Sequence, residues 1–338
     1  MSSKKITRRD FVKLCGAASL ALAAAPAGLV SLAEASSGPG RFVQTHLKMG
    51  TTVTLTAATK DADQAHEAFE SAWREIDRLI AVFDRHQPGT AVSELNASGR
   101  LADPGPEMLE VLEYSAKAHL VSGGAFDPTV LPLLTLLTTD IEKKGRPPLD
   151  NEIAEILPLV DFKTVTYGKS GVRLGKQGQA VSFDGVAKGY IVDRAMDKMK
   201  SAGLKNALIN AGGDIKAIGR RETGLPWRVA IQDPFNGAKY ARIMDLSDQS
   251  VATSGSYEIF YDQEQKNHHL MDPKVGRSAF GLVSSTAVAD TAAQADSMAT
   301  AAFIKPQVLA DAHVDGLVID RTGRQTYSDG FGKLLARS

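Results

Sequence analysis

The chain has 338 residues, of which 43% are hydrophobic and 23% are charged. Lys and Arg together number 39, as do Asp and Glu, and this balance excludes the strongly basic composition of a nucleic-acid-binding protein. The single cysteine is Cys15, so the rest of the chain forms no disulfide, holds no thiolate metal site and has no cysteine nucleophile.

Residues 1–35 have the pattern of an export signal. The twin-arginine pair Arg8 and Arg9 precedes a stretch rich in Ala, Leu and Gly, and a small-x-small cleavage site ends at Ala35. The alternative is a basic cytosolic tail before a core helix. We expect cleavage after Ala35, export of the folded protein by the twin-arginine machinery, and a periplasmic location.

The expected mature chain, residues 36–338, is slightly acidic. The leader holds five of the 39 basic residues and two of the 39 acidic ones, which leaves 34 against 37. This length and apolar content are sufficient for a large core, as a single large domain or as two closely joined lobes. We find no internal repeat after residue 40.

The first elements expected in the mature chain are a strand pair and a long helix. Residues 42–57 have β-branched, partly alternating character interrupted by a Met-Gly pair, which predicts a bent strand or a hairpin. Asp61 and Gln64 then form a capping pair for a helix whose apolar residues share one stripe as far as Phe83.

The middle of the chain predicts fewer regular elements. A second helix over residues 108–120 ends at a Gly-Gly pair. Residues 124–148 are expected to be rich in loops, because Gly and Pro recur there. A short helix is predicted over residues 150–157.

The last part of the chain mixes strands and helices. Residues 163–181 alternate like a hairpin, and residues 187–201 predict a helix followed by glycine. Short strands are predicted at residues 207–210, 228–232, 242–246 and 316–320. Since the strands come in groups, we expect an α+β fold with a largely antiparallel sheet core and flanking helices.

Residues 292–303, AAQADSMATAAF, predict a helix that is apolar on nearly all sides. Asp296 and Thr300 lie one turn apart and share a face, so their oxygens can meet at one point. Hard oxygen ligands of this kind suit Mg²⁺. From the pattern alone, a buried Asp that caps a loop and a Thr bonded to its own helix is the more common arrangement.

Four glycine-containing polar segments interrupt apolar surroundings: residues 183–190, 210–214, 252–258 and 268–276. Glycine beside Ser or Thr lets backbone N–H groups approach an anion closely, although each segment alone is weak evidence. None of them matches the glycine-rich motifs of Rossmann folds or P-loop proteins.

The last of these segments begins with two histidines, His268 and His269. A neutral imidazole is well suited to accept a proton near pH 7, but a single loop histidine is more often structural or exposed. Zinc is not indicated, because the histidines are scattered and do not form an H-x-x-x-H pair.

These segments occur in the order typical of the ApbE-type flavin transferases (FAD:protein FMN transferases), and the chain resembles that family over residues 45–305. The matching segments are MGTTVTL (49–55), PGTAVSELN (88–96), GAFDPTVLPL (124–133), FDGVAKGYIVDRA (183–195), LINAGGDI (208–215), VATSGSYE (251–258), HHLMDPKVG (268–276) and ADSMATAAF (295–303). An ordered series of this length is far more specific than any one of its members.

The resemblance implies a role for particular residues. The side chains of Asp296 and Thr300, with a backbone carbonyl near Ala187, would bind Mg²⁺, and His269 would be the catalytic base. The residues implied to contact FAD are Met49, Lys188, Asn210, Gly212, Gly213, Asp214, Thr253, Ser254 and Gly255.

The activity that the resemblance implies is Mg²⁺-dependent transfer of FMN from FAD to a Thr or Ser hydroxyl of an acceptor flavoprotein, with release of AMP. Two alternatives remain open, namely hydrolysis of FAD to FMN and AMP, and binding or delivery of FAD without turnover. The expected acceptor is a flavoprotein subunit of a membrane respiratory or electron-transfer system, including that of nitrous-oxide respiration.

Two positions depart from the family pattern. An aromatic residue is usual near His86, and a tryptophan is common near Leu137. These departures affect the expected contacts with a ring of FAD rather than the metal or phosphate sites.

Overall fold

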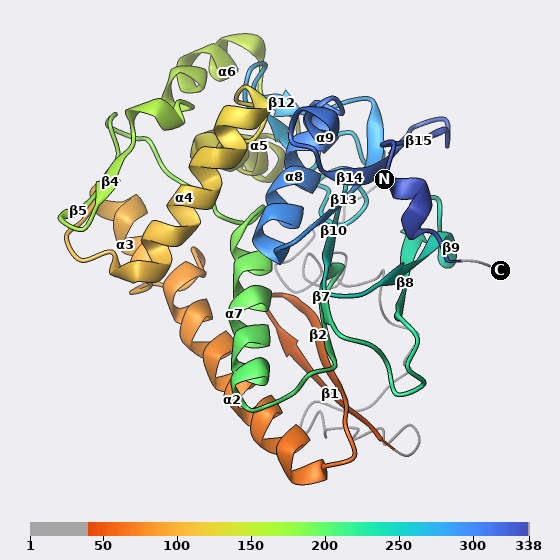
Figure 1. Cartoon of the computed structure of the whole chain (residues 1–338). Helices are drawn as coiled ribbons and strands as arrows, with labels where there is room; N and C mark the ends of the chain where they lie inside the picture. The colour runs from red at the N-terminus through yellow and green to blue at the C-terminus, as the bar shows by residue number, and fades with distance from the viewer. Residues whose placement is uncertain (1–39, 337–338) are drawn as a thin grey trace, which may run out of the picture.

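The structure is a computed structural model that describes residues 40–336 (Figure 1). The predicted export signal, with Cys15, lies outside the described residues. Within residues 40–336, no helix combines the length and the apolar character that crossing a membrane requires.

The described chain begins with a hairpin, which confirms one of the two arrangements predicted for residues 42–57. Strands β1 (Arg41–Lys48) and β2 (Thr51–Ala58) pair antiparallel, with Lys48 opposite Thr51. Met49 and Gly50 form the two-residue turn at φ values of 52° and 70°. Two consecutive residues with positive φ are typical of the tight turns that join paired strands.

The hairpin is one edge of an eight-stranded sheet in the order β1-β2-β6-β7-β10-β13-β14-β15. Every neighbouring pair in it is antiparallel, which confirms the predicted fold class. The remaining strands are β6 (Ala207–Ala211), β7 (Asp214–Ile218), β10 (Ser250–Gly255), β13 (Leu282–Ala289), β14 (Asp315–Asp320) and β15 (Gln325–Tyr327).

Four helices cover one face of this sheet (Figure 1). They are α2 (Ala62–Phe83), α4 (Gly105–Ser122), α7 (Ala187–Ser201) and α8 (Ala292–Ile304). All four were expected, and Asp61 caps α2 by accepting from the backbone N–H of Gln64 at 3.0 Å. The main apolar core lies between these helices and the sheet.

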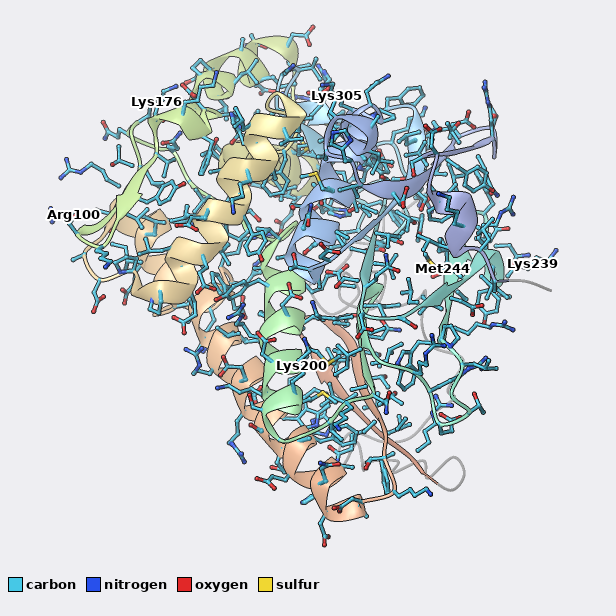
Figure 2. The ribbon with its side chains drawn as sticks, in the orientation of Figure 1. Arg100, Lys176, Lys200, Lys239, Met244 and Lys305 are labelled. Carbon is cyan, nitrogen blue, oxygen red and sulfur yellow. The ribbon has the colours of Figure 1, made fainter. Side chains whose placement is uncertain are left out.

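The other face of the sheet packs against a separate hairpin, β8 (Trp227–Asp233) and β9 (Asn236–Leu246). Neighbouring residues of one strand point into the two cores: Val251 packs under this hairpin and Ala252 packs under the helices. Met244 of β9 is fully buried. Lys176 and Lys239 lie at the periphery of the molecule in the side-chain view (Figure 2).

The prediction that residues 124–148 are rich in loops is wrong in part, because they contain the helix α5 (Leu131–Lys144). Pro132 stands in the first turn, where its missing N–H is not needed, and Gly145 caps the end in a left-handed conformation. Leu133, Leu134 and Leu137 of α5 pack in a small core of their own. Glycine and proline here mark the ends of a helix rather than a loop.

Three central strands, β7, β10 and β13, have no counterpart among the predicted elements. All five residues of β7 are buried, as are five of the six in β10. A strand covered on both faces lacks the alternation on which sequence-based recognition depends.

Shorter elements complete the described chain. They are α3 (Ala91–Ser98), β3 (Arg100–Leu101), η1 (Pro128–Val130), α6 (Asp150–Ile156), η2 (Leu157–Leu159), η3 (Phe162–Thr164), β4 (Thr166–Gly168), β5 (Gly171–Arg173), β11 (Met271–Asp272), β12 (Arg277–Ser278), α9 (Val308–Asp311) and η4 (Phe331–Leu334). The short helix α6 and the β4–β5 hairpin were both predicted.

Candidate active site

Three of the predicted site residues meet where α7, β7 and α8 come together. Lys188 lies in the first turn of α7, Asp214 begins β7, and Asp296 lies in α8. Lys188 Nζ is 3.3 Å from Asp214 Oδ2. Asp214 is 1% exposed and Asp296 is 5% exposed, so both carboxyl groups are removed from water.

Burial and mutual repulsion disfavour the charged forms of the carboxyl groups in this cluster. Burial, and then repulsion by Asp214, raise the pKa of Asp296 well above its ordinary value. Burial also raises the pKa of Asp214, although Lys188 opposes the shift. The pKa of Lys188 is raised despite its burial, because Asp214, Asp296 and Glu258 all attract its charge. Three carboxyl groups therefore act electrostatically on one ammonium group.

Asp296 is held in place by the start of α7. Its Oδ2 accepts a hydrogen bond from the backbone N–H of Gly189 at 3.1 Å. The two helices approach closely there, since a Cβ built on Gly189 would lie 2.2 Å from the carbonyl oxygen of Ala292. Glycine at this position lets the two helices pack closely enough for the Asp296 bond to form.

The second predicted side-chain ligand, Thr300, lies one turn further along α8. Its Oγ1 is 3.2 Å from Ser254 Oγ of β10, so two hydroxyl groups meet there. A Cβ built on Gly185, just before α7, would lie 2.8 Å from Thr300 Oγ1. Thr253, next to Ser254, bonds instead to Thr286 of the neighbouring strand, with 2.9 Å between their Oγ1 atoms. The structure thus brings Ser254 and Thr300 together.

The Gly212-Gly213 segment is the tight turn between β6 and β7. Both residues have positive φ, 60° and 101°, and Asn210 Oδ1 accepts from the N–H of Gly213 at 3.1 Å. A Cβ on Gly212 would lie 2.3 Å from Thr51 Oγ1, whereas nothing lies within 4 Å of one on Gly213. The turn therefore packs against the β1–β2 turn that carries Met49, and open space lies beside Gly213.

His269 has the protonation pattern of a base. Its Nδ1 lies 3.1 Å from the carbonyl oxygen of Ile259, which accepts but does not donate, so Nδ1 carries the proton and Nε2 has a free lone pair. Burial lowers the pKa of His269, so the ring is neutral near pH 7. Two charged groups also act on the pKa of His269: Asp184 raises it and Lys188 lowers it.

His268 is a structural residue by contrast. It is fully buried, its Nε2 lies 3.0 Å from the carbonyl oxygen of Ala279, and its Nδ1 accepts from the N–H of Leu270 at 3.3 Å. Burial lowers the pKa of His268 to about 4. The sequence alone does not separate these two neighbouring histidines, whereas the structure leaves a ring nitrogen available only on His269.

Sequence reasoning did not select two acids that act electrostatically on the site, Glu258 on Lys188 and Asp184 on His269. Burial raises the pKa of Glu258, at the end of the ATSGSYE segment, to about 7. Asp184 forms an ion pair with Arg85 at 2.9 Å. Both acids lie inside segments already noted for their glycines. The polar residues of those segments could therefore have pointed to these two acids.

Residues 40–336 contain no group of three or more His, Cys, Asp and Glu side chains arranged to hold a metal ion. A divalent cation here would therefore depend on hydroxyl and carbonyl oxygens as well as carboxylates. Asp214 Oδ2 is buried, and its contact with Lys188 Nζ, at 3.3 Å, is longer than an ordinary charge-assisted hydrogen bond. An all-oxygen donor set with excess negative charge fits Mg²⁺. The assignment of Asp296, Thr300 and the Ala187 carbonyl as ligands stays a prediction.

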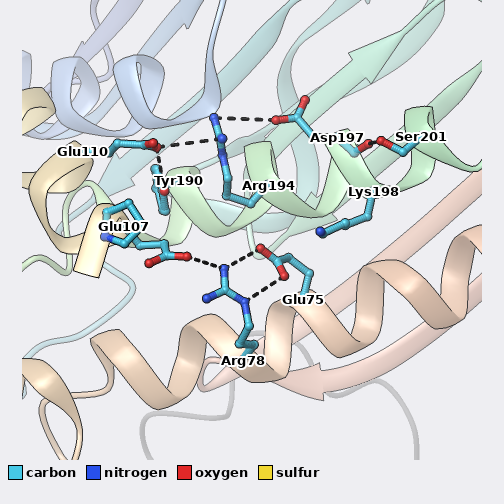
Figure 3. Close-up of a pocket in the computed structure, with 10 residues that line it drawn as sticks. Glu75, Arg78, Glu107, Glu110, Tyr190, Arg194, Asp197, Lys198 and Ser201 are labelled. Carbon is cyan, nitrogen blue, oxygen red and sulfur yellow. Dashed lines mark hydrogen bonds and ion pairs between the residues drawn. The ribbon is translucent and has the colours of Figure 1, made fainter. Parts of the chain in front are cut away.

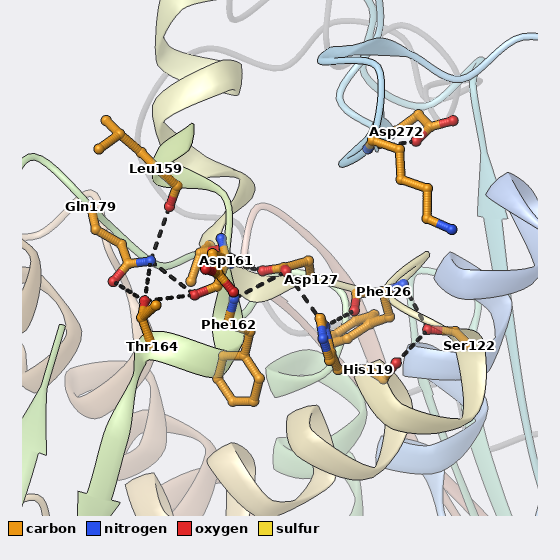
Figure 4. Close-up of polar contacts among 12 residues, drawn as sticks. His119, Ser122, Phe126, Asp127, Leu159, Asp161, Phe162, Thr164, Gln179 and Asp272 are labelled. Carbon is orange, nitrogen blue, oxygen red and sulfur yellow. Dashed lines mark hydrogen bonds and ion pairs between the residues drawn. The ribbon is translucent and has the colours of Figure 1, made fainter. Parts of the chain in front are cut away.

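The FDPT part of the GAFDPTVLPL segment has a structural role (Figure 4). Asp127 Oδ1 accepts from the N–H and the hydroxyl of Thr129, and its Oδ2 accepts from the N–H of Phe162 at 3.2 Å. His119 Nδ1 lies 3.0 Å from the carbonyl oxygen of Phe126 and 3.4 Å from Asp127 Oδ2. This network ties the end of α4 to η1 and η3.

A pocket of about 220 Å³ lies between α2, α4 and α7 (Figure 3). Arg78 pairs with Glu75 at 2.8 Å and with Glu107 at 2.7 Å, and the hydroxyl of Tyr190 donates to Glu110 at 2.7 Å. Most of the charged side chains that line the pocket therefore pair with one another. The contact of Tyr190 with Glu110 holds α7 against α4.

Comparison with known proteins gives a consistent result. The model described as "ApbE family" matches residues 49–316. Proteins named FAD:protein FMN transferase from Haemophilus influenzae and Treponema pallidum are each 27% identical, covering 73% and 78% of this chain and 74% and 78% of their own lengths. The crystal structure of the ApbE protein from Thermotoga maritima superposes with a TM-score of 0.80 at 26% identity, covering 88% of this chain and all of that one.

Proposed function

This chain belongs to the ApbE family, and we propose that it is an FAD:protein FMN transferase that moves FMN from FAD to a Thr or Ser hydroxyl of an acceptor flavoprotein. The observation that carries the proposal is the cluster of Lys188, Asp214 and Asp296 together with the neutral His269. A buried carboxylate pair suits a metal-bound diphosphate, and a free imidazole nitrogen suits the activation of a hydroxyl.

In the proposed reaction the acceptor oxygen attacks the phosphorus of the FMN half of FAD. The new P–O ester bond forms as the P–O bond of the diphosphate bridge breaks, and AMP leaves with the electron pair. His269 Nε2 takes the proton of the hydroxyl, because Nδ1 is already engaged with the carbonyl of Ile259. The base is expected to contribute about 10²- to 10⁴-fold to the rate.

Asp296, Thr300 and the backbone carbonyl of Ala187 would hold Mg²⁺. When bound, this ion would offset negative charge on the diphosphate and on the leaving phosphate. Lys188 supplies a fixed positive charge at the same place, and its contact with Asp214 keeps the ammonium group from turning away. The open space beside Gly213 gives room for the proposed FAD contact.

The proposed setting follows from the predicted export signal. The acceptor would be a flavoprotein subunit of a membrane respiratory or electron-transfer system exposed to the periplasm, including that of nitrous-oxide respiration. The twin-arginine machinery would export this chain folded.

The test combines the purified protein, FAD, Mg²⁺ and a candidate acceptor domain, and looks for flavin fluorescence on the acceptor in a denaturing gel. We expect labelling by the unaltered protein and by the control variant His66→Ala, whose histidine is exposed on α2. His269→Ala and Asp296→Ala should label poorly.

The same reactions distinguish the two alternatives. Release of AMP and FMN without a labelled acceptor would identify a hydrolase. FAD binding without AMP release would identify a carrier. Undiminished labelling by either site variant would remove that residue from the proposed mechanism.

A further inference from the structure

A second buried ion pair lies beside the candidate active site. Lys216 Nζ of β7 is 2.7 Å from Asp193 Oδ1 of α7, and it also donates to the carbonyl oxygen of Asp290 at 3.1 Å. Asp193 is 5% exposed and Lys216 is 8% exposed. A lysine and an aspartate are rarely buried to this extent unless they are paired.

Asp193 also caps the helix that carries Asp296. Its Oδ1 accepts from the N–H of Ala292 and its Oδ2 from the N–H of Ala293, both at 2.9 Å. Thr291, the residue before the helix, accepts separately from the N–H of Gln294 at 3.2 Å. Three otherwise unpaired N–H groups at the start of α8 are thereby satisfied, and a negative charge lies at the positive end of its dipole.

The ion pair joins the same three elements as the candidate site, at positions two to four residues away on each. On α7, Asp193 lies one turn after Gly189, whose N–H binds Asp296. On β7, Lys216 lies two residues after Asp214 and so points to the same face of the sheet. On α8, Asp296 lies one turn after Ala292.

We propose that Asp193 and Lys216 are positioning residues that fix the relative placement of Lys188, Asp214 and Asp296. This inference rests on the proposed function, since it assigns the pair a role in assembling that site. Neither residue is among those implied to contact FAD or Mg²⁺. The pair acts by locking α7, β7 and α8 together through three short contacts, so its loss lets α8 shift along α7 and opens the distance between the carboxyl groups.

The isosteric variant Asp193→Asn tests this role with little change in volume. An amide has one acceptor oxygen, so its NH₂ group must face a backbone N–H of α8 or the ammonium of Lys216, and either contact is repulsive. Lys216→Met removes the ammonium group but keeps an unbranched chain. The double variant tests coupling, because two residues that act as one unit should cost no more together than the worse single change.

The measurements are the affinity for Mn²⁺, used as the probe ion and followed by electron paramagnetic resonance with FAD present, and kcat and KM for the acceptor domain. We expect the Mn²⁺ dissociation constant of each single variant to rise roughly 10- to 100-fold, as found for residues that orient metal ligands. The expected kcat falls with it, while the KM for the acceptor stays within about twofold, because the pair is buried and offers no surface to a partner protein.

Two controls separate positioning from simple loss of stability. Val229→Ala removes buried volume under the β8–β9 hairpin and should lower the urea midpoint without changing Mn²⁺ affinity. Lys176→Met breaks the peripheral ion pair with Asp161, which spans 2.9 Å, and should change neither property (Figure 2).

The outcomes are distinct. If the unaltered protein labels the acceptor, and folded Asp193→Asn and Lys216→Met bind Mn²⁺ within about twofold of it, the positioning role is overturned. If the unaltered protein does not label any acceptor but the variants lose Mn²⁺ affinity as expected, the proposed function fails while the positioning of the cluster stands. Should Lys216→Met not fold, Asp193→Asn alone decides the question.

Discussion

The packing of α7 against α8 makes a sharp prediction at Gly189. A Cβ at this position would lie 2.2 Å from the carbonyl oxygen, 2.5 Å from the carbonyl carbon of Ala292 and 2.8 Å from the nitrogen of Ala293. All three are backbone atoms, so no flexible side chain can move aside. Reaching an ordinary contact of about 3.5 Å requires the helices to separate by roughly 1.3 Å.

Helix propensity and packing act in opposite directions for Gly189→Ala. Alanine in a helix is favoured over glycine by about 1 kcal/mol. Overpacking of a core costs about 1–3 kcal/mol, and the upper part of that range applies because the clash is with backbone. We therefore expect the free energy of unfolding to fall by about 2 kcal/mol, with weaker Mn²⁺ binding because the N–H of Gly189 moves away from Asp296.

Urea denaturation of the unaltered protein and of Gly189→Ala measures the difference. Gly332→Ala is the matched control, since no atom lies within 4 Å of its built Cβ and its φ is not in the left-handed region. The control should be neutral or slightly stabilising. An unchanged or increased urea midpoint for Gly189→Ala would refute the close approach of α7 and α8.

Three further predictions follow from the same structure. Because the folded protein raises the pKa of Asp296, it binds more protons than the unfolded chain, so metal-free stability falls as the pH rises above about 4; Asp296→Asn should flatten that dependence in urea titrations at several pH values while abolishing labelling. Because burial lowers the pKa of His269, kcat should rise with pH with its midpoint below 6.5, the ordinary pKa of histidine. A midpoint above 6.5 would contradict a neutral base. Trp73→Phe removes the 2.9 Å bond from Nε1 to Gln44 Oε1 and leaves a buried amide oxygen unpaired, so thermal unfolding should show a loss of about 1–3 kcal/mol.

Some features of the candidate site can be recognised from a short stretch of sequence, and others depend on residues far apart in the chain. The β1–β2 turn at Met49-Gly50 and the β6–β7 turn at Gly212-Gly213 occur within short stretches, and each contains glycine at a positive φ, which glycine adopts readily. The pairing of Lys188 with Asp214, by contrast, joins residues from two different elements. No spacing rule along the chain predicts that contact.

The neighbouring histidines illustrate the same limit. His268 and His269 have nearly the same sequence surroundings, yet one is fully buried against Ala279 and the other keeps a free ring nitrogen. Which ring faces the site depends on carbonyl groups at Ile259 and Ala279, which the loop and strand geometry bring into place. The choice of His269 from sequence rested on the family resemblance rather than on its own environment.

By itself, the sequence determined the helices with an apolar stripe, the tight turns at glycine, the α+β class and the family, because periodicity, backbone conformation and ordered motifs are local properties of the chain. Only the tertiary structure decided that α5 is a helix, that β7 and β10 are buried central strands, and that Asp193 and Lys216 brace the helix carrying Asp296. A strand that is buried on both faces lacks the alternation of polar and apolar residues by which a strand is recognised in sequence. A charged side chain needs a partner only where the surrounding elements exclude water, and that depends on the tertiary structure.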